Sequence, residues 1–214
     1  LPSSQPAVTV LGTAVVAPFI HTEERSDAML DPVRWKSNGT AGLRPGVVRL
    51  IDQTRLPNEL VYVELDEAAA IHDAICRLVV RGAPAIGCAA ALGLAAVCQH
   101  SDAASPVEFR GAVHATAEYL ATSRPTAVNL FWALDRCEEV VAEAVAGGEQ
   151  AVDALKDALL REALSIVEED IELGRCIGQA GCELFGGRSG VGVLTHCNAG
   201  ALATAAYGTA LAPV

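Results

Sequence analysis

Cys197 is the residue whose position most strongly suggests chemistry, because it ends the apolar run 191–197 (VGVLTHC) and precedes the turn 198–200 (NAG). We expect a short buried strand over 191–197 and a closely packed helix from Gly200 onward. A cysteine at such a junction lies near the unpaired amides and the positive dipole end of the helix. These groups favour a thiolate and also suit the binding of a ligand anion.

A second interpretation of Cys197, as a small packed side chain, stays open on this pattern. Side chains alternate along a strand, so we expect the preceding residue, His196, to face away from Cys197 and to be a hydrogen-bonded core residue. The other histidines are His21, His72, His100 and His114. Neither their spacing from one another nor their spacing from the cysteines fits a set of metal ligands, so we predict no metal site, and we predict no cofactor.

Two arginines precede predicted helix starts. Arg81 opens the stretch 81–87 (RGAPAIG) and Arg124 lies in 123–134 (SRPTAVNLFWAL), each with a proline suited to the first helical turn. An arginine beside a helix N-terminus forms a phosphate-sized site, so we predict that Arg81 and Arg124 converge on one anion. For Arg81, capping of the carbonyls of the preceding helix is an equally supported alternative.

The elements that must position these groups follow from local patterns. Alternating β-branched runs predict a small antiparallel sheet built from 33–35, 47–57 and 60–65. Apolar residues at three- and four-residue spacing predict helices over 67–80, 85–98, 106–122, 126–145 and 149–178.

Three details of these helices are expected from residue type. Ser123 or Thr126 caps the helix that starts near 126, and Phe131 and Trp132 pack in the core. The charged run 168–170 (EED) lies opposite an apolar stripe, which indicates a solvated face.

Composition narrows the class of protein. The chain has 214 residues, 51% apolar but only 4% aromatic, so its core must consist largely of Ala, Val, Leu and Gly. A net charge of −11 repels nucleic acid, which we do not expect as a partner. Seven cysteines without a CxxC pair indicate a reducing compartment, cytoplasmic or also nuclear in a eukaryote, with most thiols buried.

Neither hydrophobic run of the sequence predicts a membrane partner or a targeting segment. The uncharged run 82–98 is rich in Ala and Gly and fits a buried helix better than a membrane span. The run 7–20 lacks the preceding basic stretch of a signal peptide.

Four stretches together resemble the methylthioribose-1-phosphate isomerase family of methionine salvage: VVRGAPAIG (79–87), SRPTAVNLFWAL (123–134), EEDIELGRCIG (168–178) and LTHCNAGALATAAYGTALAP (194–213). The same superfamily includes ribose-1,5-bisphosphate isomerases and regulatory subunits of a translation-initiation exchange factor. The resemblance implies a cofactor-free aldose–ketose isomerase that converts 5-methylthioribose 1-phosphate to 5-methylthioribulose 1-phosphate. The alternative is a non-catalytic regulatory or nucleotide-sensing subunit, and a thiol-dependent hydrolase comes third.

The resemblance also implies which residues act. Arg81, Gly82, Ala83 and Arg124 bind the phosphorylated sugar, mainly through its phosphate, and Cys197 is the catalytic cysteine. A catalytic Asp, a substrate-binding Gln and an Asn-Lys pair of the family have no counterpart in these residues, so we expect them in a C-terminal remainder of the same protein. A homodimer is expected as well.

The implied fold class is α/β, and we expect three parts. Residues 1–30 form an irregular extension, and 31–187 form a domain with a small β-sheet and a helical bundle. Residues 188–214 begin a Rossmann-like domain with its first strand–helix unit, which is incomplete in this sequence.

Overall fold

Three short strands form one antiparallel sheet at the start of the described part of the chain. The computed structural model describes residues 30–39, 42–188 and 190–214, so nearly all of the predicted extension over 1–30 lies outside it. The strands are β1 (Val33–Ser37), β2 (Gly46–Ile51) and β3 (Tyr62–Leu65), with β2 in the centre. The predicted antiparallel sheet is confirmed.

Five α-helices follow the sheet within the described residues, so the predicted mixture of a small sheet with helices is confirmed. They are α1 (Ala68–Cys76), α2 (Ala83–Cys98), α3 (Pro106–Ala121), α4 (Val128–Ala146) and α5 (Val152–Cys182), with short 3₁₀ turns at Glu183–Phe185 and Ala201–Ala203. The first of them, α1, ends before its predicted end at 80. Leu78 takes a left-handed φ of 63°, and the backbone amide of Val79 donates back to the carbonyl of Ala74 at 2.9 Å.

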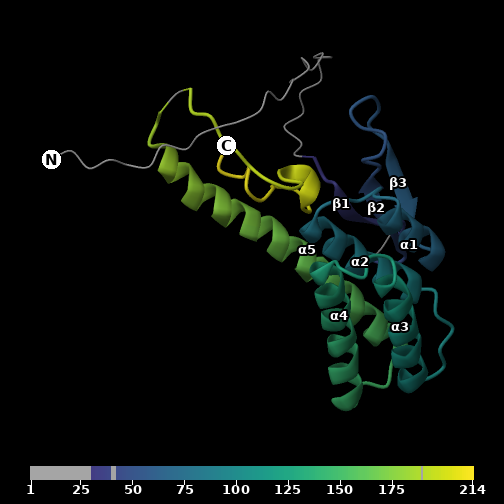
Figure 1. Ribbon diagram of the computed structural model, residues 1–214. Coiled ribbons are helices and arrows are strands. Elements are labelled where there is room, and N and C mark those ends of the chain that lie inside the picture. Colours follow the sequence, from purple (N-terminus) through teal and green to yellow (C-terminus); the bar gives the residue numbers. More distant parts are fainter. Residues whose placement is uncertain (1–29, 40–41, 189) are drawn as a thin grey trace.

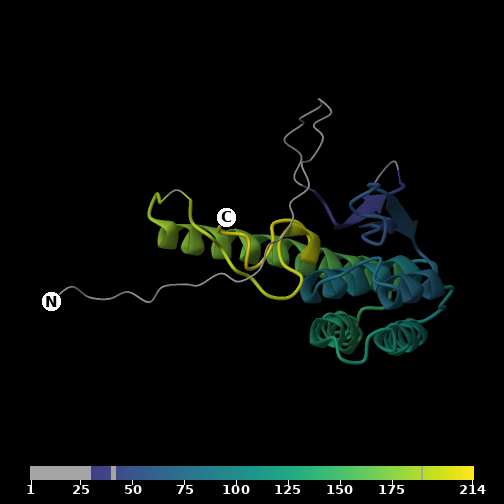
Figure 2. The same ribbon diagram turned by 45° about the horizontal axis from the view of Figure 1, so that its top comes forward.

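Helix α2 forms the centre of the molecule, with the sheet on one side and the α3–α4 pair on the other (Figures 1 and 2). Its small side chains let its neighbours approach closely. A Cβ added at Gly93 would stand 2.7 Å from the Ile71 side chain of α1. The prediction of a buried helix in this region is confirmed, and no helix in the described ranges has the length and apolarity needed to cross a membrane.

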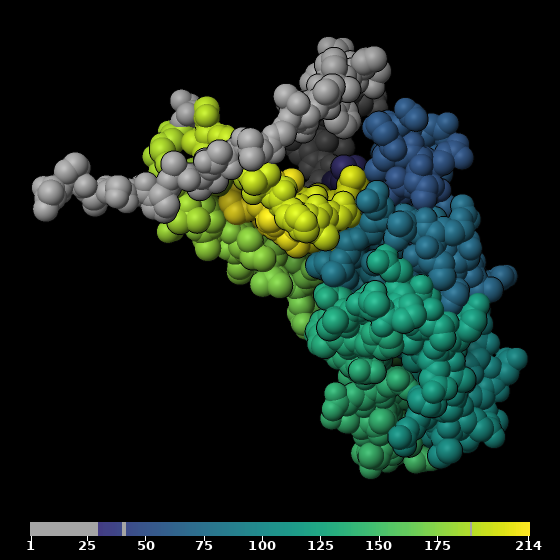
Figure 3. Space-filling model, viewed as in Figure 1, coloured from purple at the N-terminus to yellow at the C-terminus, as the bar shows by residue number. Residues whose placement is uncertain are grey.

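The C-terminal segment, residues 190–214, packs back along α5 (Figure 3). Glycines on α5 make this possible. A Cβ at Gly174 would stand 2.8 Å from the carbonyl oxygen of Gly208, and one at Gly178 would stand 2.9 Å from that of Ala212. Glycine therefore lets the backbone of the segment lie directly on the helix.

The strand predicted over 191–197 and the helix predicted from Gly200 are wrong as local elements. Residues 191–196 are not in a strand, and after Gly200 only the 3₁₀ turn Ala201–Ala203 forms. A strand needs a neighbour to pair with its amides and carbonyls, and 191–197 has none in the described part of the chain. Its apolar side chains are consequently exposed rather than buried.

Two further burial predictions are wrong. Phe131 and Trp132 are 37% and 45% exposed because they lie on the outer face of α4, whereas Leu130 and Leu134 fill the core. All seven cysteines are free thiols, and only three of them are buried; Cys76, Cys176, Cys182 and Cys197 are exposed.

Candidate anion and thiol site

The start of α2 is an open helix N-terminus flanked by arginine. Gly82 is the N-cap residue, with a left-handed φ of 98° and no side chain to accept from the first amides, and the first turn carries no acidic residue. Arg81 is exposed immediately before it, and Ala83 is exposed as the first helical residue. The positive end of the helix dipole therefore adjoins an arginine, and the first turn of α2 contributes no carboxylate of its own.

The alternative role for Arg81, capping of α1, has no counterpart in the described hydrogen bonds. The carbonyls at the end of α1 are already paired with backbone amides. Arg77 donates to Asp73 at 2.8 Å, and Val79 donates to Ala74 at 2.9 Å. The Arg81 guanidinium thus remains available to a ligand.

Arg124 lies half-buried in the turn between α3 and α4. Helix α4 begins at Val128 with Ala127 as its N-cap, so it also lacks a side-chain cap and an acidic first turn. The predicted capping by Ser123 or Thr126 is wrong. The hydroxyl of Ser123 instead donates to the Leu120 carbonyl at 2.6 Å, at the end of α3.

The starts of α2 and α4 adjoin each other. A Cβ added at Gly87 would stand 2.9 Å from the Asn129 carbonyl oxygen, so the second turn of α2 contacts the first turn of α4. This contact places Arg81 and Arg124 at the same end of the α2–α4 pair. Their convergence on a single anion stays a prediction.

A cavity of about 250 Å³ lies beside these helix starts, between α2, α4 and α5. It is lined by Pro84, Cys88, Asn129, Trp132, Ile166, Glu169, Asp170 and Leu173. Glu169 is held there by Arg136, which donates to both carboxylate oxygens at 2.6 Å, and these hydrogen bonds lower the pKa of Glu169. The Arg136 guanidinium also lies 5.4 Å from the centre of the Trp132 ring.

Asp170 connects this cavity to the C-terminal segment. Its carboxylate accepts a hydrogen bond from the Ala205 amide at 2.7 Å. Burial raises the pKa of this carboxyl group, and the Ala205 hydrogen bond only partly opposes the rise. The predicted solvated face over 168–170 is therefore correct for Glu168 and Glu169, which are exposed, and wrong for Asp170, which points inward.

The C-terminal segment is held against the helical domain at three points. Gln53, in the turn after β2, donates to the Leu202 carbonyl at 2.7 Å. Any side chain at Gly82 would collide with the backbone of Ala203, so these two residues are in direct contact. With the Asp170 bond to Ala205, these contacts fix residues 202–205 across the start of α2.

Cys197 lies just before this docked stretch. It is exposed, and its φ of 69° is left-handed, a conformation that residues with a side chain seldom adopt. Two buried polar atoms beside it, Thr195 Oγ1 and Asn198 Nδ2, have no hydrogen-bond partner in the described ranges. His196 is exposed, so the expectation that it is a core residue is wrong.

Cys197 is exposed in a segment that has no partner strand in the described part of the chain, and its catalytic role stays a prediction. A thiol that serves only to fill the core would be buried, as Cys88 is, where burial raises the thiol pKa far above its ordinary value. Cys197 is accessible and adjoins unpaired polar groups. It is therefore in a position to contact a ligand.

Sequence reasoning missed Gln53 and Asp170 as residues that hold this site together. Gln53 sits in a polar turn with no local signal. Asp170 carried one signal, since it falls within the stretch 168–178 that supports the family resemblance. A carboxylate in such a stretch could have been tested for an inward role.

Fold and site together define a mixed α/β protein with two helix starts that follow arginines, and residues 202–205, shortly after Cys197, cross the start of α2. This arrangement suits a small anionic ligand. Residues 79–212 match the initiation factor 2 subunit family, and the chain belongs to that family.

Relatives and solved structures agree with this assignment. The chain is 49% identical over 183 residues to a 5-deoxyribose 1-phosphate isomerase of Moorella thermoacetica, covering 86% of this chain and 48% of the relative. It is 45% identical over 185 residues to a methylthioribose-1-phosphate isomerase of Symbiobacterium thermophilum, with coverages of 86% and 48%. The chain thus spans about half the length of the curated relatives it matches.

Two crystal structures share the fold. The 5-methylthioribose 1-phosphate isomerase of Pyrococcus horikoshii superposes with a TM-score of 0.72 and 37% identity, over 84% of this chain and 46% of the other. The translation initiation factor eIF-2B delta subunit of A. fulgidus gives 0.71 and 39%, over 86% and 49%. The shared fold therefore does not by itself separate an enzyme from a subunit of an initiation factor.

Proposed function

We propose that this protein is a cofactor-free aldose–ketose isomerase acting on a ribose 1-phosphate that lacks the 5-hydroxyl group. The candidate substrates are 5-methylthioribose 1-phosphate and 5-deoxyribose 1-phosphate, after the relatives that carry these names. The two sugars share the reacting atoms and differ only at C5. Both are therefore expected to react, to 5-methylthioribulose 1-phosphate and 5-deoxyribulose 1-phosphate.

The observation that carries this proposal is the contact between Gly82 and Ala203. It holds the segment that contains Cys197 against the helix start that Arg81 flanks. A phosphate bound by Arg81, Arg124 and the open amide of Ala83 would place the attached C1 carbon of the sugar near the cysteine segment. Chemistry and phosphate recognition then fall within one site.

The reaction needs such an arrangement because the C1 phosphate locks the sugar as a closed acetal. The ring must open, and the hydrogen on C2 must end on C1 while C2 becomes a carbonyl carbon. In this proposal Cys197 serves as an acid–base group in these transfers. A water-poor surrounding protects the open form and strengthens unshielded polar interactions, and residues 193–214 contain no Asp, Glu, Lys or Arg.

The test is turnover of each sugar phosphate by the whole protein, followed by ³¹P and ¹H NMR. Formation of the ketose 1-phosphate is expected, and Cys197→Ser should lower kcat by about 10²–10⁴, the usual loss for a positioned acid–base group. Cys176→Ser, at another exposed thiol, is the matched control and should be neutral. A folded protein that converts neither sugar would refute the proposal.

The fate of the C2 hydrogen distinguishes two possible mechanisms of this isomerisation, a hydride shift and a proton transfer. With substrate deuterated at C2, a hydride shift keeps the label in the product at C1. Transfer through a protein group that exchanges with water loses it. Both routes still need a proton to leave the C2 hydroxyl and another to reach the ring oxygen, so Cys197 can serve as an acid–base group in either one.

A regulatory or nucleotide-sensing subunit is the second candidate, supported by the likeness to the eIF-2B delta subunit. Such a subunit would bind a nucleotide without converting a sugar. Calorimetry with AMP and GDP alongside the turnover assay separates the two. Nucleotide binding together with absent turnover would favour the subunit.

We also propose that the protein forms a homodimer. An exposed apolar surface near the C-terminal end of α5 supports this proposal. It is formed by Leu173 and Ile177 on the helix and by Leu184 just after it. Light scattering should give twice the protomer mass. A monomer at micromolar concentration would contradict the proposal.

A further inference from the structure

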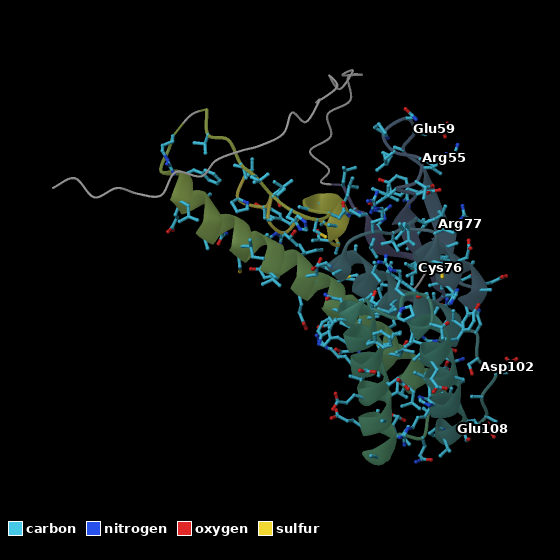
Figure 4. All side chains as sticks on the ribbon, viewed as in Figure 1. Arg55, Glu59, Cys76, Arg77, Asp102 and Glu108 are labelled. Atoms are coloured by element: carbon cyan, nitrogen blue, oxygen red, sulfur yellow. The ribbon has the colours of Figure 1, made fainter. Side chains whose placement is uncertain are left out.

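A second group of chemistry-bearing side chains lies where α1 meets the end of α3, away from the C-terminal segment. Cys76 is the last residue of α1 and is exposed, and Figure 4 shows it at the end of that helix beside Arg77. Its Sγ lies 3.6 Å from Nδ1 of His72, one turn earlier. The other ring nitrogen of His72, Nε2, lies 3.0 Å from Oγ1 of Thr122.

The hydrogen bonds around Thr122 fix which nitrogen of His72 carries the hydrogen. The Thr122 hydroxyl donates its only hydrogen to the Tyr119 carbonyl at 2.6 Å. Its oxygen can therefore only accept from His72, so the hydrogen of the neutral ring is on Nε2. This leaves the lone pair on Nδ1, which faces the sulfur of Cys76.

The His72 ring is also held in place. The Tyr119 ring stacks on it, with centres 4.7 Å apart and planes inclined by 23°. A nucleophile, a base within reach and a third group that orients the base form the arrangement by which proteins activate thiols. Thr122 is the orienting group here, and solvent reaches the sulfur.

Another cysteine of the chain provides a natural comparison. Cys176 is exposed on α5, and its Sγ lies 3.6 Å from a carboxylate oxygen of Glu172, also four residues earlier. Spacing and distance match those of Cys76, but the neighbour is an anion rather than a neutral base. Glu172 repels an approaching anionic reagent from Cys176, whereas His72 places a neutral acceptor beside Cys76.

The Cys76 thiol itself donates to the Ser123 carbonyl at 3.3 Å, so it must rotate about its Cβ–Sγ bond before Nδ1 of His72 can accept its hydrogen. We propose that Cys76 is a site of reversible mixed-disulfide formation with small-molecule disulfides. After this rotation, His72 Nδ1 takes the thiol proton as Sγ bonds to one sulfur of the disulfide. The sulfur–sulfur bond of the reagent breaks, and its second sulfur leaves as a thiolate that recovers the proton from His72. Cys76 is oxidised, the released half of the reagent is reduced, and no further oxidant is consumed.

The test uses oxidised glutathione as the probe on the whole protein at pH 7. Samples are quenched with acid, and the adduct at each cysteine is followed by peptide mass spectrometry. Cys76 is expected to react about tenfold faster than Cys176. A free thiol is already a few per cent thiolate at this pH, so activation can add little more than about 30-fold.

Two variants identify the base. His72→Gln should slow Cys76 about tenfold towards the rate of an unassisted thiol, and Thr122→Val should slow it less, because the ring remains but loses its orienting partner. The rate at Cys176 should not change in either variant. Buried Cys88, Cys98 and Cys137 report the fold, because they react only if it opens.

Two outcomes would overturn the proposal: equal rates at Cys76 and Cys176 in the unaltered protein, or an unchanged Cys76 rate in a folded His72→Gln variant. Should His72→Gln open the fold, Thr122→Val decides the question by the same comparison. A Cys76 rate that does not respond to Thr122→Val would then refute the role of His72.

Discussion

Asp170 allows the docking of the C-terminal segment to be tested by two substitutions with opposite expectations. Its carboxylate accepts from the Ala205 amide at 2.7 Å, and burial raises its pKa. Asp170→Ala removes the acceptor and leaves that amide unpaired. Leaving a buried donor unpaired costs about 1–3 kcal/mol, so the variant should be destabilised by that amount.

Asp170→Asn keeps an oxygen acceptor and removes the charge. A carboxyl pKa raised by folding means that the folded state favours the protonated form. The stabilising contribution of the carboxyl is therefore complete below its unfolded pKa of about 3.9 and is lost as pH rises through the folded pKa. At pH 7 the wild type carries the cost of the buried charge and the Asn variant does not, so Asp170→Asn should be at least as stable as the wild type.

Urea unfolding of the three proteins at pH 5 and pH 8 measures the free energies. Hydrogen exchange of the peptide that contains Ala205 measures the docking itself. At pH 8 the free energy of unfolding of Asp170→Asn should equal or exceed that of the wild type, and that of Asp170→Ala should be lower than both. The Ala205 amide should exchange faster in Asp170→Ala than in the wild type. An Asn variant less stable than the Ala variant, or unchanged exchange in the Ala variant, would refute this account of the contact.

Three further expectations follow from other contacts. Gly178→Leu should displace the C-terminal segment and expose 190–214 to proteolysis, whereas Gly111→Leu, at a helical glycine where an added Cβ meets nothing, should not. Arg136→Met removes the cation that Glu162 and Glu169 share, so it should lower the free energy of unfolding by about 1–3 kcal/mol, a value reduced for the partial exposure of these ion pairs. The stability of Arg136→Lys should lie between those of the wild type and Arg136→Met. Equal stability of Arg136→Met and the wild type would contradict this expectation. Hydrogen bonding to Glu138 raises the pKa of His114. This link between α3 and α4 should therefore stabilise the fold fully below about pH 6.5, and its contribution should be lost as pH rises through the folded pKa. His114→Gln should abolish this pH dependence of stability, and NMR of the His114 imidazole in the wild type should follow its titration.

The sheet and the helices were predictable because their signals are local. Alternation over 47–51 is enough to indicate a strand once a paired neighbour exists, and β1 and β3 supply it on both sides. Three- and four-residue spacing located each helix within a few residues. The exact ends depended on details such as the left-handed Leu78, which no periodicity indicates.

The candidate site was predictable only where one stretch of chain contains the whole signal. Arg81 precedes a helix start that Pro84 marks correctly, whereas α4 begins only at Val128, so the prediction that Pro125 lies in its first turn is wrong. The inward role of Asp170 depends on an amide 35 residues away in the sequence, so no local pattern contains it. The predicted strand over 191–197 failed for a related reason, because its formation depends on a partner strand elsewhere.

The absence of charged side chains from residues 193–214 has a physical explanation in the docked structure. Residues 202–205 of this stretch cross the start of α2, where an acidic side chain would act as an intramolecular anion and compete with the proposed phosphate for the amide of Ala83 and for Arg81. The segment is instead held by its own backbone, through the carbonyl of Leu202 and the amide of Ala205. The polar side chains that fix it belong to Gln53 and Asp170 outside the segment, so the segment itself brings no charged side chain to the helix start. Ala201→Glu should therefore weaken phosphate binding more than the neutral change Ala201→Gln does. Calorimetric titration of both variants with inorganic phosphate measures this, and equal affinities would contradict the explanation.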